Sequence, residues 1–99
     1  MSSVTLTRET NDSFSVSGVL QMDTVMSVLS DLNKQLSAES NIRIDFSGVT
    51  NSDSAAVALI IAWLAKAKKL NIRIQLVHLP QQILDIAKAS DLLEILPID

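Results

Sequence analysis

Apolar and polar residues alternate in two stretches near the start of the chain. Apolar side chains take every second position from Val4 to Leu6 and from Phe14 to Val16. This period is typical of strands with one buried face. The polar segment 9–13 between them favours a turn, so the pattern predicts an antiparallel hairpin over about residues 4–18.

Helical spacing of apolar residues follows the hairpin. Asp23 is a residue type that caps helices, and apolar residues recur after it at steps of three and four, which predicts an amphipathic helix over about 24–37. Further along, alternation predicts strands and longer apolar periods predict helices. The remaining expected elements are a strand over 41–46, a polar loop over 47–53, a helix over 54–69, a strand over 72–76 and a helix with Pro80 in its first turn.

The order of these elements is β-β-α-β-α-β-α. Strand–helix–strand units place their strands in parallel with right-handed crossovers, and the hairpin adds an antiparallel edge. The sequence therefore predicts an α/β fold, a single domain over 1–99 with a small mixed sheet of about four strands covered by helices. The apolar tail, 92–98, fits either a short strand or a helical turn.

Composition excludes several kinds of chemistry. The 99 residues include no Cys, two Gly and one His, and the net charge is −3. These counts argue against a thiolate nucleophile, a glycine-rich phosphate loop, a multi-histidine zinc site and a nucleic-acid-binding surface. We therefore expect no metal, no cofactor and no nucleic-acid partner.

Catalysis also has little support in the sequence. Asp45, Asp53 and Ser54 are scattered, and no His or Lys lies in the same loop to activate a serine. His78, after the fourth strand, is read as structural or solvent-facing. We expect the protein not to be an enzyme.

The chain has no segment that looks able to enter a membrane. The longest unbroken apolar run, 55–65, has eleven residues, whereas a spanning helix needs about 20. The first residues lack the pattern of a signal peptide. We expect no direct membrane insertion.

The helix expected over 54–69 has two apolar faces. Four branched residues within one arc are assigned to the core, and small residues, a Leu and the chain's only Trp lie roughly opposite. Either the C-terminal tail covers this second face or a partner docks on it. We favour docking with the Trp as anchor, and we expect this Trp to be partly exposed in the free protein. The core arc is Val57, Ile60, Ile61 and Leu64, and the second face is Ala55, Leu59, Ala62, Trp63 and Lys66.

The loop before this helix, 50–54, is rich in residues that cap helices, so we expect one of them to be the cap. A helix N-terminus favours negative charge, and a phosphate on Ser54 would be accommodated there. That phosphate would weaken docking at the edge of an apolar face. No motif in the chain demands phosphorylation.

Three stretches resemble the STAS family, which includes sulfate transporters and anti-sigma-factor antagonists. Residues 17–20, SGVL, resemble the "G-x-L" that ends a strand, and 42–49, IRIDFSGV, resemble the strand followed by "D-L/F-S-x-V". Residues 53–57, DSAAV, resemble the signature "D-S/T-x-G-L". Ala56 departs from the usual Gly, and Gln21 departs from an acidic residue often found there.

The resemblance implies a STAS fold over nearly the whole chain, with Ser54 at the Ser/Thr of the signature. It also implies one of two functions. The first is the MlaB-type cytosolic subunit of the Mla phospholipid-transporting ABC system, a non-catalytic accessory subunit that docks on the ATPase subunit. The second is an anti-sigma-factor antagonist whose Ser54 is phosphorylated by an anti-sigma kinase.

We favour the transporter subunit, acting in phospholipid transport and outer-membrane lipid asymmetry. Such a protein would be cytoplasmic and peripheral at the inner membrane through its partner complex. The residues expected to bind the partner are Asp53, Ser54, Ala55, Leu59, Ala62, Trp63 and Lys66.

Overall fold

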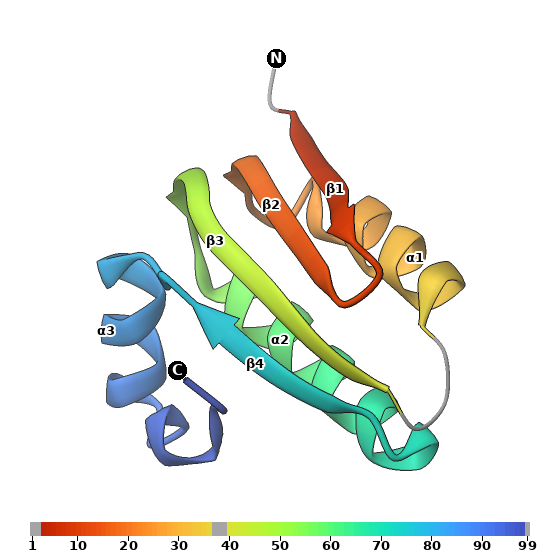
Figure 1. The fold of residues 1–99 in the computed structure, drawn as a ribbon. Coiled ribbons are helices and arrows are strands. Elements are labelled where there is room, and N and C mark those ends of the chain that lie inside the picture. Colours follow the sequence, from red (N-terminus) through yellow and green to blue (C-terminus); the bar gives the residue numbers. More distant parts are fainter. Residues whose placement is uncertain (1–2, 37–39, 99) are drawn as a thin grey trace.

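The computed structural model describes residues 3–36 and 40–98 and contains a four-stranded sheet in the order β1-β2-β3-β4 (Figure 1). The predicted order of elements and the mixed sheet are confirmed. The elements are β1 (Val4–Thr10), β2 (Ser13–Leu20), α1 (Val25–Gln35), β3 (Asn41–Ser52), α2 (Ser54–Leu70), β4 (Arg73–Val77), α3 (Gln81–Ala89) and a 3-10 turn, η1 (Leu93–Ile95).

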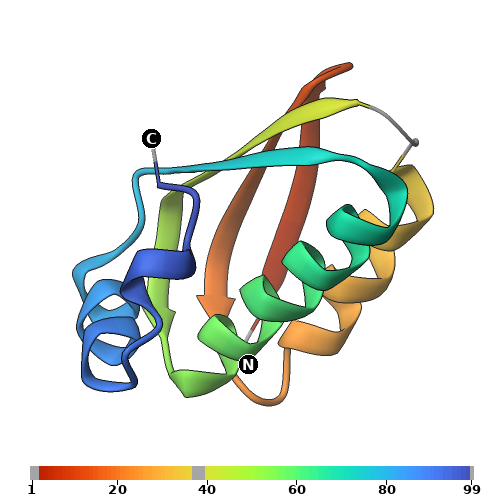
Figure 2. The same cartoon turned by 90° about the horizontal axis from the view of Figure 1, so that it is seen from below.

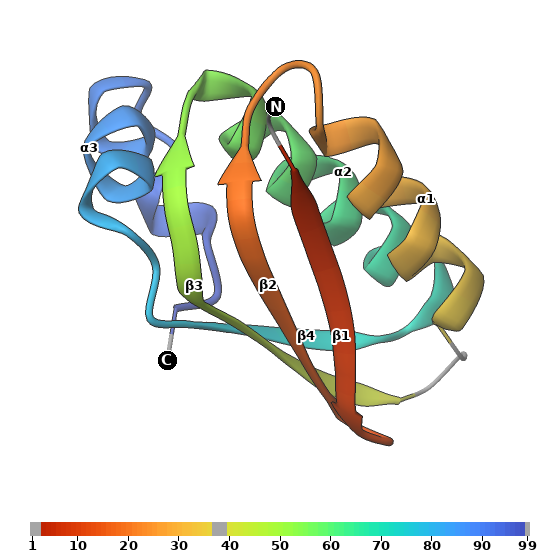
Figure 3. The ribbon, with the colours of Figure 1, turned by 90° about the horizontal axis from the view of Figure 1, so that it is seen from above.

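The sheet has one buried face and one polar face. β1 and β2 pair antiparallel, while β2 with β3 and β3 with β4 pair in parallel. Alternate side chains such as Val16, Ile44 and Leu76 are buried, and those between them, such as Arg43 and Gln75, are exposed. α1 and α2 run side by side over the buried face (Figure 2, Figure 3).

β3 is longer than the sequence pattern predicts. Residues 47–52 were expected in a polar loop, yet they continue the strand and pair with β2 as far as Leu20↔Ser52. Gly48 makes this close pairing possible, because a Cβ there would lie 2.8 Å from the Cβ of Ser17. The pairing partner therefore overrides the low strand propensity of this polar segment.

The start of α1 also differs from expectation. Asp23 lies in the turn before the helix, and Thr24 occupies the N-cap position without a side-chain capping bond. The Thr24 hydroxyl instead donates to the Val19 carbonyl at 2.8 Å and accepts from the Gln21 amide at 2.9 Å. Thr24 thus closes the turn between β2 and α1, and the predicted Asp23 cap is wrong.

The C-terminal tail forms the helical turn that was one of its two expected conformations, followed by a single bridge to the sheet. It forms the 3-10 turn η1, and then Ile98 pairs in parallel with Leu76 on β4. The Leu76 amide donates to the Pro97 carbonyl at 2.9 Å. The tail therefore lies along the outer edge of β4. Among the described residues, no helix is both long and apolar enough to cross a membrane.

Candidate functional site

The orientation of α2 decides which of its residues a partner could reach. Trp63 has an exposed fraction of 0%, and its ring centroid lies 6.5 Å from that of Phe46 on β3. Within the described part of the chain, its buried Nε1–H finds no hydrogen-bond partner. The expectation that Trp63 is partly exposed is wrong.

The error lies in the rotation assigned to α2 about its axis. Val57 and Ile60 are buried as predicted, but Ile61 and Leu64 are only half-buried. The buried arc is centred about 90° from the predicted one, at 100° per residue. Because both arcs are apolar, hydrophobicity alone could not select between them. The structure places the Trp63 arc toward the sheet, where Phe46 packs against the indole.

Part of the predicted docking face remains accessible, in a groove between α1 and α2. On the α2 side the groove is lined by small residues and one largely buried Leu, and on the α1 side by two Met, a Val and a Leu. Its volume is about 280 Å³. The residues that line this α1–α2 groove are Met22, Val25, Met26, Leu29, Ala55, Ala58, Leu59 and Ala62.

The two methionines are the most exposed large apolar residues described. Met22 is 73% exposed and Met26 is 68% exposed. By contrast, Leu59, on the floor of the groove, is only 3% exposed. Sequence reasoning missed the α1 side, although Met22, Val25, Met26 and Leu29 stand at the i, i+3, i+4, i+7 spacing of one helical face.

Asp53 links the two walls of the groove at one end. Its Oδ1 accepts from the Ala55 amide at 2.8 Å and caps α2, and its Oδ2 accepts from the Met22 amide at 3.3 Å. The expected capping residue in this loop is thus Asp53. Ser54 is the first residue of α2 and is exposed.

The structure therefore gathers most of the predicted binding residues at one place. Asp53, Ala55, Leu59 and Ala62 meet around the groove, and Ser54 lies at its Asp53 end. Lys66 is exposed further along α2, beside Ala62 and Leu29. Trp63 lies beneath this surface.

A second polar cluster joins β3 to the loop after β4. Asp45 Oδ1 accepts from the Ser47 amide at 2.8 Å and lies 3.1 Å from His78 Nδ1. These contacts, foremost the backbone hydrogen bond from Ser47, hold the pKa of Asp45 below its ordinary value. Ser47 and His78 thus both contact the Asp45 carboxylate. An activated serine nucleophile would instead need a hydrogen bond between its hydroxyl and a histidine. No group of three or more potential metal ligands occurs within residues 3–36 and 40–98.

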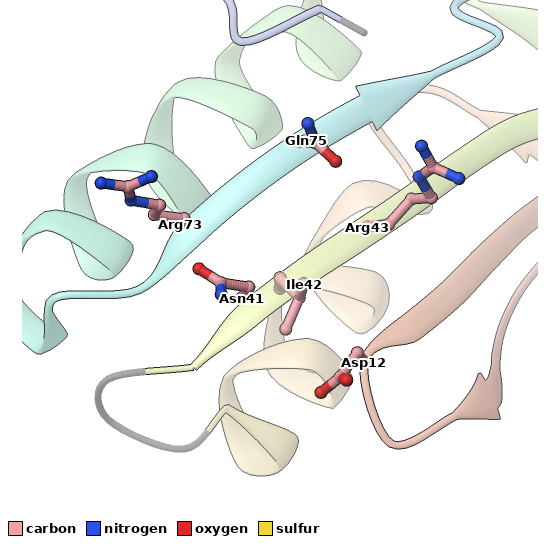
Figure 4. A pocket seen from close by; sticks show the side chains of 6 residues that line it. All are labelled: Asp12, Asn41, Ile42, Arg43, Arg73 and Gln75. Carbon is pink, nitrogen blue, oxygen red and sulfur yellow. The ribbon is translucent and has the colours of Figure 1, made fainter.

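The polar face of the sheet carries a shallow depression of about 390 Å³. Arg43 and Arg73 both line it, but Figure 4 shows their guanidinium groups extending in different directions. Asp12 adds a carboxylate at its margin. The charges do not converge on one point, so we assign no ligand site to this face.

Comparisons with known proteins agree with this architecture. The family model described as "Mlab, STAS domain" matches residues 5–97. A similar solved structure is "Structure of the Anti-Sigma Factor Antagonist SpoIIAA in its Unphosphorylated Form", with a TM-score of 0.72 and 14% sequence identity over 98% of this chain and 88% of that chain. At this identity the likeness concerns the fold alone. Comparison with curated proteins finds no match.

Proposed function

We propose that the chain, which belongs to the Mlab STAS family in agreement with the STAS resemblance of its three sequence motifs, is the accessory subunit of an Mla-type ABC transporter. It binds the transporter's ATPase and catalyses no reaction itself. Its role is in phospholipid transport and the lipid asymmetry of the outer membrane. It works in the cytoplasm, held at the inner membrane by its partner complex.

The observation that carries this proposal is the α1–α2 groove. Exposed contiguous apolar surface marks interaction sites, and here it combines two exposed methionines with a wall of alanines. Methionine is flexible and adapts its shape to a partner. Small alanine side chains let a partner backbone or side chain approach α2 closely. These properties suit the docking of an apolar element of another protein.

Trp63 has a supporting role in this proposal. Since its indole is buried against Phe46, it fixes α2 on the sheet and does not touch the partner. The contact residues that remain from the sequence prediction are Ala55, Leu59 and Ala62, the neighbouring Asp53 and Ser54, and Lys66 further along α2.

A pair of matched substitutions tests the groove. Ala58 is exposed and lines the groove, while Ala89 is exposed at the end of α3 and lies outside it. Ala58→Arg should reduce affinity for the purified cognate ATPase by roughly thirtyfold or more, since about 2 kcal/mol is typical of a disrupted interface centre. Ala89→Arg should leave affinity unchanged. Titration calorimetry measures both, and wild-type affinity in Ala58→Arg would refute docking in this groove.

The exposed hydroxyl of Ser54 favours one alternative, an anti-sigma-factor antagonist regulated by phosphorylation of this residue. Ser54 stands at the first position of α2, where free amides and the helix dipole tolerate a phosphate. Phosphoserine at Ser54 in protein isolated from its native cells, together with binding to an anti-sigma kinase, would support this alternative. Binding to the transporter ATPase with an unmodified Ser54 would contradict it.

A further inference from the structure

The α1–α2 groove changes character along its length. Beyond its apolar part, the groove continues between the C-terminal halves of the two helices through the shared residues Leu29 and Ala62. The borders of this second part carry lysines, whereas the borders of the apolar part carry methionines. The border lysines are Lys66 and Lys69 on α2, and Lys34 lies in an adjoining hollow on α1 that shares Leu29 and Asn33 with this part of the groove.

These lysines, Lys34, Lys66 and Lys69, form no ion pair with an acidic side chain among the described residues. The chain as a whole carries a net charge of −3, whereas Lys66 and Lys69 bring two positive charges to this end of the groove. Lys69, like Lys68, also lies in the last turn of α2, where a cation complements the helix dipole. Lys66 precedes that last turn and borders the groove.

The opposite end of the groove is bordered by carboxylates. Asp53 caps α2 and contacts the Met22 amide, and Asp23 follows Met22 in an exposed turn. The groove is thus acidic at one end, apolar in the middle and basic at the other end. A partner with a matching charge gradient would be accepted in only one direction, because the reverse orientation would place like charges together.

We propose that the groove binds an amphipathic helix of the ATPase whose apolar stripe is followed by Asp or Glu residues. This inference rests on the proposed function. The stripe packs on Met22, Met26 and Ala58, and the carboxylates lie over Lys66 and Lys69. From Ala55 to Lys69, at 1.5 Å per residue, the contact extends about 21 Å, or roughly four helical turns. Electrostatic complementarity of this kind sets orientation and speeds association.

Charge reversal tests the acidic character of the occupant. The variant Lys66→Glu/Lys69→Glu reverses the basic border, and Lys68→Glu/Lys88→Glu makes the same change of net charge at exposed lysines outside the groove. Against the purified cognate ATPase at low salt, the first variant should associate at least tenfold more slowly and the second within about twofold of wild type. Addition of 0.5 M salt should bring the association rates of the two variants closer together, since salt screens the charges strongly at this concentration. Circular dichroism checks that both variants fold.

The outcomes separate this inference from the proposed function. If Ala58→Arg abolishes binding but Lys66→Glu/Lys69→Glu does not, the groove is the docking site and the acidic occupant is refuted. If neither affects binding, the docking site itself is refuted. If the isolated wild-type chain dimerises in sedimentation and Ala58→Arg prevents this, the occupant is a second copy and the inference is overturned. Restoration of binding by an Asp/Glu→Lys change in the ATPase helix would establish the contact.

Discussion

Substitution of Trp63 tests whether its side chain stabilises the core or contacts the partner. The indole is fully buried, and truncating a buried Trp to Ala costs about 3–5 kcal/mol of unfolding free energy. A domain of this size has a total stability of about 5–15 kcal/mol, so Trp63→Ala should remove a large part of it. With a urea dependence of about 1–3 kcal/mol per molar, the unfolding midpoint should fall by at least about 1 M. Far-UV circular dichroism must follow the transition, because the variant has no Trp left to fluoresce.

A second substitution at the same position uses the lone Nε1–H. Trp63→Phe leaves a smaller cavity and removes a buried donor that has no hydrogen-bond partner within the described residues, a group that is costly to bury. It should therefore destabilise much less than Trp63→Ala and bind the ATPase with nearly wild-type affinity. In the wild-type protein, acrylamide should quench the indole poorly. An unchanged midpoint in Trp63→Ala, or a thirtyfold loss of affinity in a stably folded Trp63→Phe, would refute the buried, supporting role.

Three further predictions concern Asp53 before α2, Gly18 in β2 and Asp45 in β3. Asp53→Ala removes the acceptor of the Ala55 and Met22 amides and should cost about 0.5–2 kcal/mol in urea denaturation, whereas Asp53→Asn should cost less. Gly18→Ala should cost about 1–3 kcal/mol in the same assay, because φ is +95° and a Cβ would collide with the Ser3 carbonyl oxygen; an unchanged midpoint would contradict the conformation. The pKa of Asp45 is lowered, so its stabilising effect is present above the ordinary Asp pKa of about 3.9 and is lost as the pH falls through the lowered value. The effect on the free energy of unfolding should be small because the Asp45 side chain is 36% exposed. An NMR titration that gave an ordinary pKa for the Asp45 carboxyl would contradict the lowered pKa.

Local periodicity was sufficient to predict the order of the elements. Alternation over residues 4–6, 14–16 and 41–46 reflects a sheet with one buried face, and each strand shows this pattern by itself. The extension of β3 to Ser52 was not predictable in this way, because its polar residues are held by pairing with β2. Residues 47–52 form a strand only because they pair with residues distant in sequence, as in Leu20↔Ser52.

The candidate site was predicted on one helix and missed on the other. Ala55 and Ala62 were recognised because a surface helix with alanines in place of polar residues is unusual. Met22 and Met26 were overlooked because their importance depends on α1 lying beside α2. The rotation of α2 was misassigned because Ile61 and Trp63 are both apolar, and only the position of Phe46 beneath the helix decides which one is buried.

The pairing of Ile98 with Leu76 limits how the sheet can grow. An uncovered edge strand offers free amides and carbonyls that recruit strands from other molecules and lead to aggregation. Here the chain's own last residues occupy part of the outer edge of β4. At the other edge, β1 carries the charged Arg8 and Glu9, which discourage a foreign strand. This protection of the sheet margins agrees with the proposed docking of a partner on the helical side of the domain.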